Sequence, residues 1–260
     1  MDINAPQEKH ALILGASSGL GRASAEKLAS KGWKVWAVYR ERRAPHRALV
    51  DEWKEAFGAQ LVPINTNALS AETRPEIWEA MQEAKGKLGL LLHSISRGTP
   101  GILWAEGQGK ELSAKDLSLT WEAMALNWLE WSREALQLGF FAPQAANLAF
   151  TSMGSSRSLP GYAAIGMAKA SLESLGRYMA AEFFKYGLRT NLIQAGITPT
   201  PALKVLPGID QKIEEVRKLH PVQRLTTPED VANVVYLLSR QEANWINGAI
   251  IPVDGGETLI

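Results

Sequence analysis

The sequence predicts an α/β fold: a single domain, residues 1–260, built on a doubly wound parallel sheet flanked by helices on both faces. Strand-like and helix-like segments alternate along all 260 residues without a linker or an internal repeat. This alternation is typical of parallel sheets, whose crossover connections are helices. A glycine-rich loop, Gly15–Gly21, lies between the first expected strand and the first expected helix. The length suits one domain with a well-buried core.

The first half of the chain is expected to alternate between strand and helix. Short apolar or alternating runs mark the strands, and apolar positions three and four apart mark the helices. The expected strands are Ala11–Leu14, Lys34–Tyr39, Gln60–Asn65 and Leu88–Ser94. The last of these is almost wholly apolar, as buried parallel strands tend to be. The expected helices are Leu20–Lys31, Arg43–Phe57 and Glu72–Lys85.

The second half continues the alternation with longer helices. A glycine-rich, polar stretch, Gly98–Ser113, is expected to be a loop, and residues 198–220 an irregular, partly helical excursion broken at Pro207-Gly208. Pro228 and Glu229 suit the start of a helix. The expected helices are Asp116–Leu138, Tyr162–Tyr186 and Pro228–Ser239, and the expected strands are Asn147–Thr151, Leu188–Ile193 and Ile250–Val253.

Composition argues against several classes of protein. The formal net charge is +1, so no basic field favours a nucleic-acid partner. Cysteine is absent, which removes disulfides, thiolate metal sites and thiol nucleophiles. The four histidines, at 10, 46, 93 and 220, have no metal-ligand spacing, so no metal is expected. No apolar run approaches the roughly 18 residues of a membrane span, and the first residues lack the apolar core of a secretory signal, so a cytoplasmic protein is expected.

The glycine loop has the spacing Gly15-x-x-x-Gly19-x-Gly21 between a strand and a helix, the context in which such loops bind dinucleotides. Glycines permit a tight turn and let the backbone approach a pyrophosphate at the helix N-terminus. The spacing differs from the Gly-x-Gly-x-x-Gly of larger dehydrogenases, and an ordinary glycine-rich turn is the alternative. A Rossmann-type dinucleotide site is predicted at Gly15, Ser17, Ser18, Gly19, Leu20 and Gly21.

The end of the second strand indicates which dinucleotide binds. An acidic residue there binds the ribose 2′-hydroxyl of NAD, whereas an arginine accommodates the 2′-phosphate of NADP. Arg40 occupies this position, and its planar guanidinium suits phosphate. Glu41 is adjacent, and a solvated charge cluster at a helix start is the alternative. NADPH is the predicted cofactor, with NADH as the alternative.

The segment from Tyr162 to Lys169 carries the most informative chemistry. The two residues are seven positions apart, nearly two turns of a helix. Both side chains are therefore expected on one face, about 10 Å apart along the axis, whereas a four-residue spacing would separate them by about 6 Å. A tyrosine and a lysine beside a dinucleotide indicate hydride and proton transfer, and the longer reach is the clue to the reaction.

These motifs together resemble the short-chain dehydrogenase/reductase family, and more closely its enoyl-acyl-carrier-protein reductase branch. The similarity covers almost the whole chain. Its most specific part is Tyr162–Glu173, which continues into Arg177-Tyr178-Met179-Ala180. The glycine loop, His93-Ser94-Ile95 and Val253-Asp254-Gly255-Gly256 also resemble family segments.

The resemblance gives the position of the tyrosine a chemical meaning. Carbonyl-reducing members of the family place tyrosine four residues before lysine, where this chain has Ile165, which cannot transfer a proton. Tyr162 matches the displaced tyrosine of the enoyl reductases. A ketoreductase delivers hydride to the carbonyl carbon, whereas an enoyl reductase delivers it to C3 of a conjugated thioester, farther from the carbonyl oxygen. The resemblance implies that Tyr162 donates a hydrogen bond to the enolate oxygen that develops there.

The resemblance also implies roles for neighbouring polar residues. Lys169 is expected to bind the nicotinamide ribose hydroxyls and to make Tyr162 more acidic. Ser152, seventeen positions before the lysine, matches the active-site serine of the wider family, where many enoyl reductases have a second tyrosine. It either hydrogen-bonds the substrate carbonyl or satisfies a strand end. Asn127 matches an asparagine that supports the lysine and a proton-relay water, with a satisfied helix-interior residue as the alternative.

Further contacts with the cofactor and substrate follow by position in the resemblance. Asn65 stands where an aspartate is usual near the adenine, and Ile197 where proline is common. His93 is expected to be structural or near the cofactor rather than catalytic. Residues 198–220 match the substrate lid, with a permanently packed helix as the alternative. The expected cofactor contacts beyond the glycine loop are Arg40, Asn65, Thr66, Ser94, Ile95, Lys169, Gly196, Ile197, Thr198 and Thr200.

The function that these features predict is NAD(P)H-dependent reduction of trans-2-enoyl thioesters, on acyl-carrier protein, in fatty-acid or polyketide synthesis. A homotetramer is expected by analogy, with Trp121, Trp128 and Trp131 in the core or at a subunit interface rather than lining the substrate. One alternative is another reductase of the family, acting on a ketone, alcohol or dienoyl substrate. A non-catalytic dinucleotide-binding protein is the other.

Overall fold

The computed structural model describes residues 9–41, 45–104, 106, 111–206 and 208–259, and it confirms the predicted fold class. Seven strands form one sheet in the order β3-β2-β1-β4-β5-β6-β7, and neighbouring strands of this sheet are parallel. The order reverses between β1 and β4, the position where doubly wound sheets bind ligands. The strands are β1 Lys9–Leu14, β2 Lys34–Tyr39, β3 Leu61–Asn65, β4 Lys87–His93, β5 Phe141–Thr151, β6 Leu188–Ala195 and β7 Ile250–Val253.

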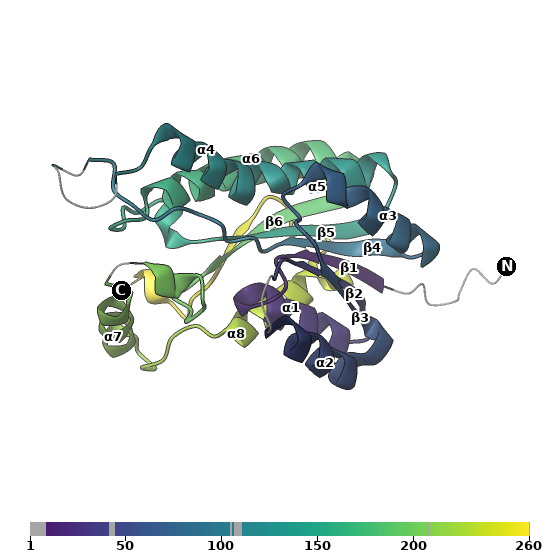
Figure 1. Cartoon of the computed structure of the whole chain (residues 1–260), viewed down its shortest axis with the longest axis horizontal. Coiled ribbons are helices and arrows are strands. Elements are labelled where there is room, and N and C mark those ends of the chain that lie inside the picture. Colours follow the sequence, from purple (N-terminus) through teal and green to yellow (C-terminus); the bar gives the residue numbers. More distant parts are fainter. Residues whose placement is uncertain (1–8, 42–44, 105, 107–110, 207, 260) are drawn as a thin grey trace.

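Helices cover both faces of the sheet (Figure 1). One layer consists of α1 Gly19–Ser30, α2 Pro45–Phe57 and α8 Pro228–Leu238. The other consists of α3 Arg74–Glu83, α4 Ala114–Trp121, α5 Asn127–Gln137 and α6 Ala163–Phe183. Helix α7, Ile209–Leu219, lies at one end of the sheet beside the C-terminal residues (Figure 1).

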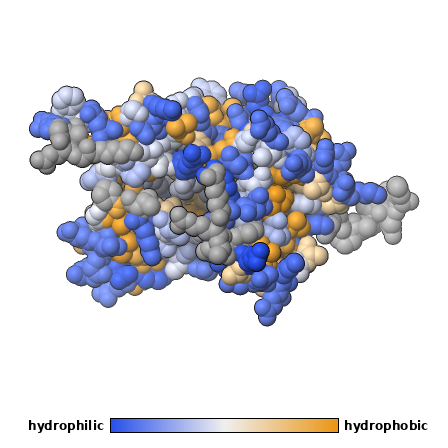
Figure 2. All heavy atoms as spheres, viewed as in Figure 1, coloured by the Kyte–Doolittle hydropathy of each residue, from blue (hydrophilic) through white to orange (hydrophobic). Residues whose placement is uncertain are grey.

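Alternate side chains of the central strands belong to two separate buried clusters, one on each face of the sheet. In β1, Ala11 and Ile13 contribute to one buried cluster, and Leu12 and Leu14 contribute to the other. Successive side chains of a strand point to opposite faces, so each strand supplies both helical layers. On the surface, hydrophilic residues dominate the face drawn in Figure 2, and apolar residues show there in separate, smaller patches.

A buried hydrogen-bond network attaches α5 to the sheet. The indole N–H of Trp128 donates to Asn147 Oδ1 over 2.7 Å, and the Ser132 hydroxyl donates to the same oxygen over 3.2 Å. Trp128 and Trp131 are fully buried, as expected for core residues, and the half-buried Trp121 donates to Ser171 Oγ over 2.7 Å. These partners satisfy polar groups that would otherwise be costly to bury.

The structure differs from the sequence prediction in two long elements. Strand β5 begins at Phe141 rather than Asn147, because its early residues still pair with β4. The segment predicted as one helix, Asp116–Leu138, is helical without a break, but a π turn at Glu122–Leu126 separates α4 from α5. A π turn widens a helix by one residue and frequently accompanies a functional site.

The loop predicted at Gly98–Ser113 contacts the start of α6. The Gly101 N–H donates to the carbonyl of Gly161 over 2.9 Å, and Gly101 pairs with Tyr162 in an isolated parallel bridge. Residues 105 and 107–110 of this loop lie outside the described residues, as do Arg43 and Pro207 of other predicted segments. Within the described ranges, no helix has the length and apolarity needed to span a bilayer.

Candidate active site

A cavity of about 840 Å³ lies where the carboxyl ends of β1, β2, β4, β5 and β6 meet the loops that follow them. Its size is within the usual range for cofactor and ligand sites. Gly21, Asn65 and Asn127 are the predicted site residues that do not line it. The predicted residues that line it are Gly15, Ser17, Ser18, Gly19, Leu20, Arg40, Thr66, Ser94, Ile95, Ser152, Tyr162, Lys169, Gly196, Ile197, Thr198 and Thr200.

The glycine loop forms a tight turn between β1 and α1. Gly15 has φ +92°, a left-handed conformation that favours glycine, and its N–H donates to the carbonyl of Val38 over 2.9 Å. Gly21 lies behind the loop, where a Cβ atom would overlap the carbonyl oxygen of Gly15. The Ser18 side chain does not cap α1, although Ser18 is its N-cap residue. The first turn of α1 therefore presents its N–H groups toward the cavity in the manner of a pyrophosphate site.

The adenosine end of the cavity is formed by the ends of β2 and β3. Arg40 is exposed and lines the cavity, so its guanidinium is available for a 2′-phosphate. Asn65 instead joins the two strands, since its side chain exchanges hydrogen bonds with the backbone N–H and carbonyl of Glu41, each 3.0 Å long. The lining after β3 is Thr66, Asn67, Ala68 and Leu69, of which sequence reasoning identified only Thr66.

Tyr162 lies immediately before α6, not inside it, as the N-cap residue with φ −107° and ψ 6°. Its hydroxyl is 3.1 Å from Ser152 Oγ, so strand β5 and helix α6 bring the two predicted catalytic hydroxyls together. Its ring packs against Gly154, where a Cβ atom would come within 2.5 Å of the ring carbons. The position of the phenol therefore depends on this close packing and on the Ser152 hydroxyl rather than on helical periodicity.

Burial raises the pKa of Tyr162, and the hydrogen bond with Ser152 opposes this rise only in part. Lys169 is not among the groups that shift the pKa of Tyr162 in the structure, so its acidifying effect on this tyrosine stays a prediction. A phenol with a raised pKa keeps its proton at neutral pH. Tyr162 is thus suited to donate a hydrogen bond to an oxygen on which negative charge develops.

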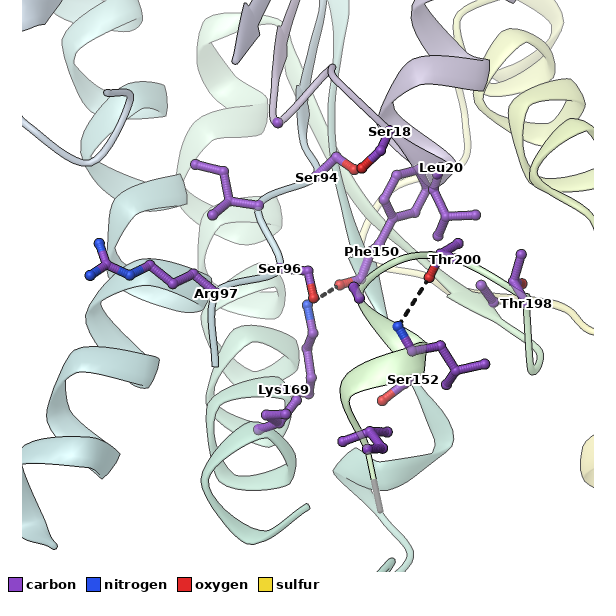
Figure 3. Close-up of a pocket in the computed structure, with 18 of the residues that line it drawn as sticks. Ser18, Leu20, Ser94, Ser96, Arg97, Phe150, Ser152, Lys169, Thr198 and Thr200 are labelled. Carbon is purple, nitrogen blue, oxygen red and sulfur yellow. Dashed lines mark hydrogen bonds between the residues drawn. The ribbon is translucent and has the colours of Figure 1, made fainter. Parts of the chain in front are cut away.

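Lys169 projects from α6 into the cavity, and its Nζ donates to the carbonyl of Phe150 over 2.7 Å (Figure 3). Only 7% of the residue is exposed. Burial lowers its pKa to about 8, and the nearby carboxylate of Glu173 opposes this shift. At neutral pH the amine remains mainly protonated, and it lies where it can donate to a ligand in the cavity.

His93 and Asn127 are buried polar neighbours beside the cavity, and only His93 lines it. Burial, followed by the charge of Lys169, lowers the pKa of His93 to about 3, so the imidazole is neutral at physiological pH. The neighbouring Asn127 and the Ala123 carbonyl, within the π turn, oppose this shift. Asn127 Nδ2 donates to the carbonyl of Ala68 over 3.0 Å, so this side chain supports the loop after β3. His93 also lines the cavity, which agrees with its expected place near the cofactor.

The cavity beside the segment predicted as a lid is lined by both apolar and polar residues. Leu206 of this segment packs against the cluster of Met124, Ile165 and Ala168, in which Ile165 occupies the position expected for the tyrosine of carbonyl-reducing members. Sequence reasoning did not identify the loop residues opposite the lid, because single apolar residues in a loop have no periodic signal. The additional lining residues at this end are Ser96, Arg97, Met153, Leu159, Pro160, Ile165, Ala202, Leu203, Leu206, Gly208, Ile209, Gln211 and Glu215. In Figure 3, Arg97 is directed away from Ser152 and Lys169.

The donor groups of the cavity fit a nicotinamide dinucleotide. They comprise the glycine turn and helix N-terminus for a pyrophosphate, and Lys169 for ribose hydroxyls. Among the described residues, no group of three or more histidine, aspartate or glutamate side chains is placed to hold a metal ion. The fold and the cavity together define a dinucleotide-dependent oxidoreductase.

Comparison with known proteins extends this classification. A sequence model of the family described as enoyl-(acyl carrier protein) reductase matches residues 15–258. FabI of Aquifex aeolicus, an NADH-dependent enoyl-[acyl-carrier-protein] reductase, is 28% identical over 255 residues, covering 95% of this chain and 90% of FabI. The crystal structure of the enoyl-[acyl-carrier-protein] reductase (NADH) of that organism has a TM-score of 0.84 at 24% identity and covers 98% of both chains.

Other similar proteins catalyse different reactions. A probable 2,4-dienoyl-CoA reductase of Bacillus subtilis is 29% identical over 262 residues, covering 97% of this chain and 98% of that protein. MabA of Mycobacterium tuberculosis, a 3-oxoacyl-[acyl-carrier-protein] reductase, is 26% identical over 246 residues, covering 94% of this chain and 91% of MabA. The chain belongs to the short-chain dehydrogenase/reductase family, in the type that the matching model describes as enoyl-(acyl carrier protein) reductase. Members of this family are oxidoreductases that bind NAD(P)H.

Replacing Lys169 with methionine should weaken cofactor binding without lowering the stability of the fold. We expect NAD(P)H to bind at least about 10-fold more weakly, because a charge-assisted donor is lost. The cofactor-free variant should be no less stable than the wild type at pH 7, since methionine fills similar space without a buried charge. Fluorescence titration of the cofactor and denaturant unfolding measure the two effects.

The pH dependence of stability supplies a control for this substitution. Lys169 binds its proton more weakly in the folded protein, with a pKa of about 8, than in the unfolded chain, where it is 10.5. The unfolded state therefore holds more protons between these values, and stability from this group rises with pH across that window. The stability of the wild type relative to K169M should increase from pH 8 to 10.5. A constant difference would contradict the assignment of the lowered pKa to this lysine.

Proposed function

We propose that this protein reduces the C2–C3 double bond of trans-2-enoyl thioesters carried on acyl-carrier protein, using NADPH. The observation that supports this most directly is that a tyrosine stands at position 162 and an apolar residue at position 165, where carbonyl-reducing members have the tyrosine. Tyr162 hydrogen-bonds Ser152 in the cavity, whereas Ile165, at the usual tyrosine position, packs against Met124 and Ala168. The match to the enoyl-(acyl carrier protein) reductase family and the similarity to FabI support the same reaction.

The chain's own residues have three tasks in this mechanism. The bound dinucleotide supplies the hydride, which C3 of the substrate accepts. Tyr162 keeps its proton because burial raises its pKa, and it donates a hydrogen bond to the thioester oxygen as the enolate charge develops. Ser152 holds the phenol from the β5 side, and Lys169, which projects into the cavity, would hold the ribose that carries the reacting ring. The enolate then takes a proton from solvent water at C2, which completes the reduction.

The apolar end of the cavity suits an acyl chain. Leu203, Leu206 and Ile209 of the lid line the cavity, and so do Met153 and Leu159. Such a surface excludes water from the reacting carbons and binds the hydrocarbon by burial. The lid function predicted for residues 198–220 is part of this proposal, and α7 forms Ile209–Leu219 of that segment.

We also propose a homotetramer as the active assembly. Apolar side chains on the outer faces of α4 and α6 support this, since Leu119, Met167 and Tyr178 are 48%, 42% and 66% exposed. Helix faces with exposed apolar residues mark interaction surfaces in soluble proteins.

Reduction of a 3-oxoacyl thioester is the second candidate reaction. It is favoured by Ser152, whose Oγ lies 3.1 Å from the Tyr162 hydroxyl, in the position of the wider family's catalytic serine. The similarity to MabA supports it as well.

Paired assays distinguish the two reactions. Purified protein is mixed with NADPH or NADH and either a trans-2-enoyl or a 3-oxoacyl thioester, and the nicotinamide absorbance is followed. We expect oxidation with the enoyl substrate and none with the oxo substrate, because Tyr162 is placed for a distant carbonyl oxygen. Oxidation with the oxo substrate alone would assign the protein to the second candidate reaction.

Replacing Tyr162 with phenylalanine tests the hydrogen-bond donor. We expect kcat for the enoyl thioester to fall by about 10²- to 10³-fold, the usual effect of removing one donor to a developing oxyanion. The dissociation constant of NADPH should stay within about twofold, since the ring still packs against Gly154. Tyr186→Phe is the matched control, because Tyr186 is 62% exposed and does not line this cavity. Equal kcat values for the two variants would remove Tyr162 from the mechanism.

Replacing Arg40 with alanine tests the choice of cofactor. The KM for NADPH should rise by about 10-fold or more, because a charged hydrogen bond to phosphate is lost, while the KM for NADH stays nearly constant. Arg47→Ala is the control, since Arg47 is an exposed cation on α2 that does not line the cavity. An unchanged ratio of the two KM values in R40A would show that Arg40 does not bind the 2′-phosphate.

A further inference from the structure

The last turn of the chain contacts the loop at the nicotinamide end of the cavity. Glu257 is 5% exposed, and its Oε2 accepts a hydrogen bond from the Ile197 N–H over 2.9 Å. Ile197 belongs to the segment Ala195–Thr198, all of which lines the cavity. A buried carboxylate from the C-terminal end therefore holds the backbone of the loop that bounds the cofactor site.

The identity of residue 197 gives this contact its significance. Ile197 supplies a backbone N–H donor in a half-buried loop, and such a donor needs a partner inside the protein. A carboxylate is a stronger acceptor than a carbonyl, because its charge shortens and strengthens the bond. Glu257 thus fixes the position of this N–H with a charged acceptor, and a proline at position 197 would have no N–H for it to bind.

The surrounding residues hold Glu257 in place. Asp254 accepts hydrogen bonds from the Gly256 N–H over 2.9 Å and from the Thr258 hydroxyl over 2.6 Å, which closes the turn that carries Glu257. Although desolvation raises the pKa of Asp254, these hydrogen bonds lower it below its ordinary value, so the carboxylate stays ionised. Arg157 Nη2 donates to the carbonyl of Thr258 over 2.8 Å and ties the same turn to the loop after β5.

The loop side of the contact is equally constrained. The Gly196 N–H donates to the carbonyl of Val253 over 3.1 Å, and a Cβ atom at Gly196 would lie 2.8 Å from Glu257 Oε2. The Thr198 hydroxyl donates to the carbonyl of Gly196 over 2.9 Å, so this side chain is turned back onto the loop. Two strand ends and one carboxylate therefore set the path of residues 196–198.

We propose that Glu257 is a positioning residue for the nicotinamide end of the cofactor, acting through the Ile197 N–H. The carboxylate does not contact the reacting atoms; it preorganises the loop whose backbone faces the nicotinamide. This inference rests on cofactor binding by the family and is independent of which thioester the protein reduces. Its loss should therefore appear in cofactor binding rather than in the chemical step.

The test compares E257A, E257Q and I197P by fluorescence titration of NADPH, by thermal unfolding without cofactor and by steady-state kinetics. E257A should weaken NADPH binding by about 10-fold, the usual effect of losing a charged hydrogen bond. E257Q keeps an acceptor and should stay within about threefold of the wild type. At saturating NADPH, kcat of E257A should return to within about twofold of the wild type, so that the change appears in KM. Glu242→Ala is the matched control, since the Glu242 side chain is 73% exposed.

A double-mutant cycle decides whether the effect passes through Ile197. I197P removes the donor while leaving Glu257 in place, and it should also weaken NADPH binding. Adding E257A to I197P should then change binding by less than about twofold, because the two single changes remove one interaction. Additive losses, unchanged binding in E257A, or a failure of E257Q to restore binding would each overturn the proposal. If E257A does not fold, unchanged binding in I197P would overturn it equally.

Discussion

The hydrogen bond from Lys169 Nζ to the carbonyl of Phe150 is the interaction on which the site depends most. It joins the second turn of α6 to the carboxyl end of β5 and directs a buried ammonium into the cavity. Burial of this charge is unfavourable, as its lowered pKa shows, and the fold tolerates it because Glu173 lies one helical turn away. The carbonyl and this carboxylate together keep the lysine protonated in a place where solvent cannot.

The arrangement of the tyrosine follows from a second constraint, the close approach of Gly154 to its ring. A phenol placed before the helix, rather than within it, can lie farther from the lysine than helical spacing allows at the usual position. Ile165, three residues later, instead packs with Met124 and Ala168, and Leu206 packs against this apolar cluster. The displacement of the tyrosine thus leaves an apolar side chain in the cavity wall at position 165.

Several buried polar side chains do not line the cavity but hydrogen-bond to the loops that do. The Ala68 carbonyl accepts from Asn127 Nδ2 over 3.0 Å and from Trp131 Nε1 over 2.9 Å, so α5 holds the loop at the adenosine end. The turn containing Glu257 holds the loop at the opposite end. Both supports come from residues distant in sequence from the loops they hold. A dinucleotide site of this kind is rigid because separate elements brace each of its loops.

The sequence alone was sufficient to predict the strand–helix alternation, the glycine turn and the Tyr162–Lys169 pair. These features are local, because a period, a spacing or a glycine acts over a few residues. Tertiary structure decided what depends on contacts between distant segments. It placed Asn65 on the Glu41 backbone instead of in the cavity, raised the pKa of Tyr162 through burial, and brought Glu257 to Ile197. Desolvation and long-range hydrogen bonds have no signature in a single sequence, since they exist only once the chain has packed.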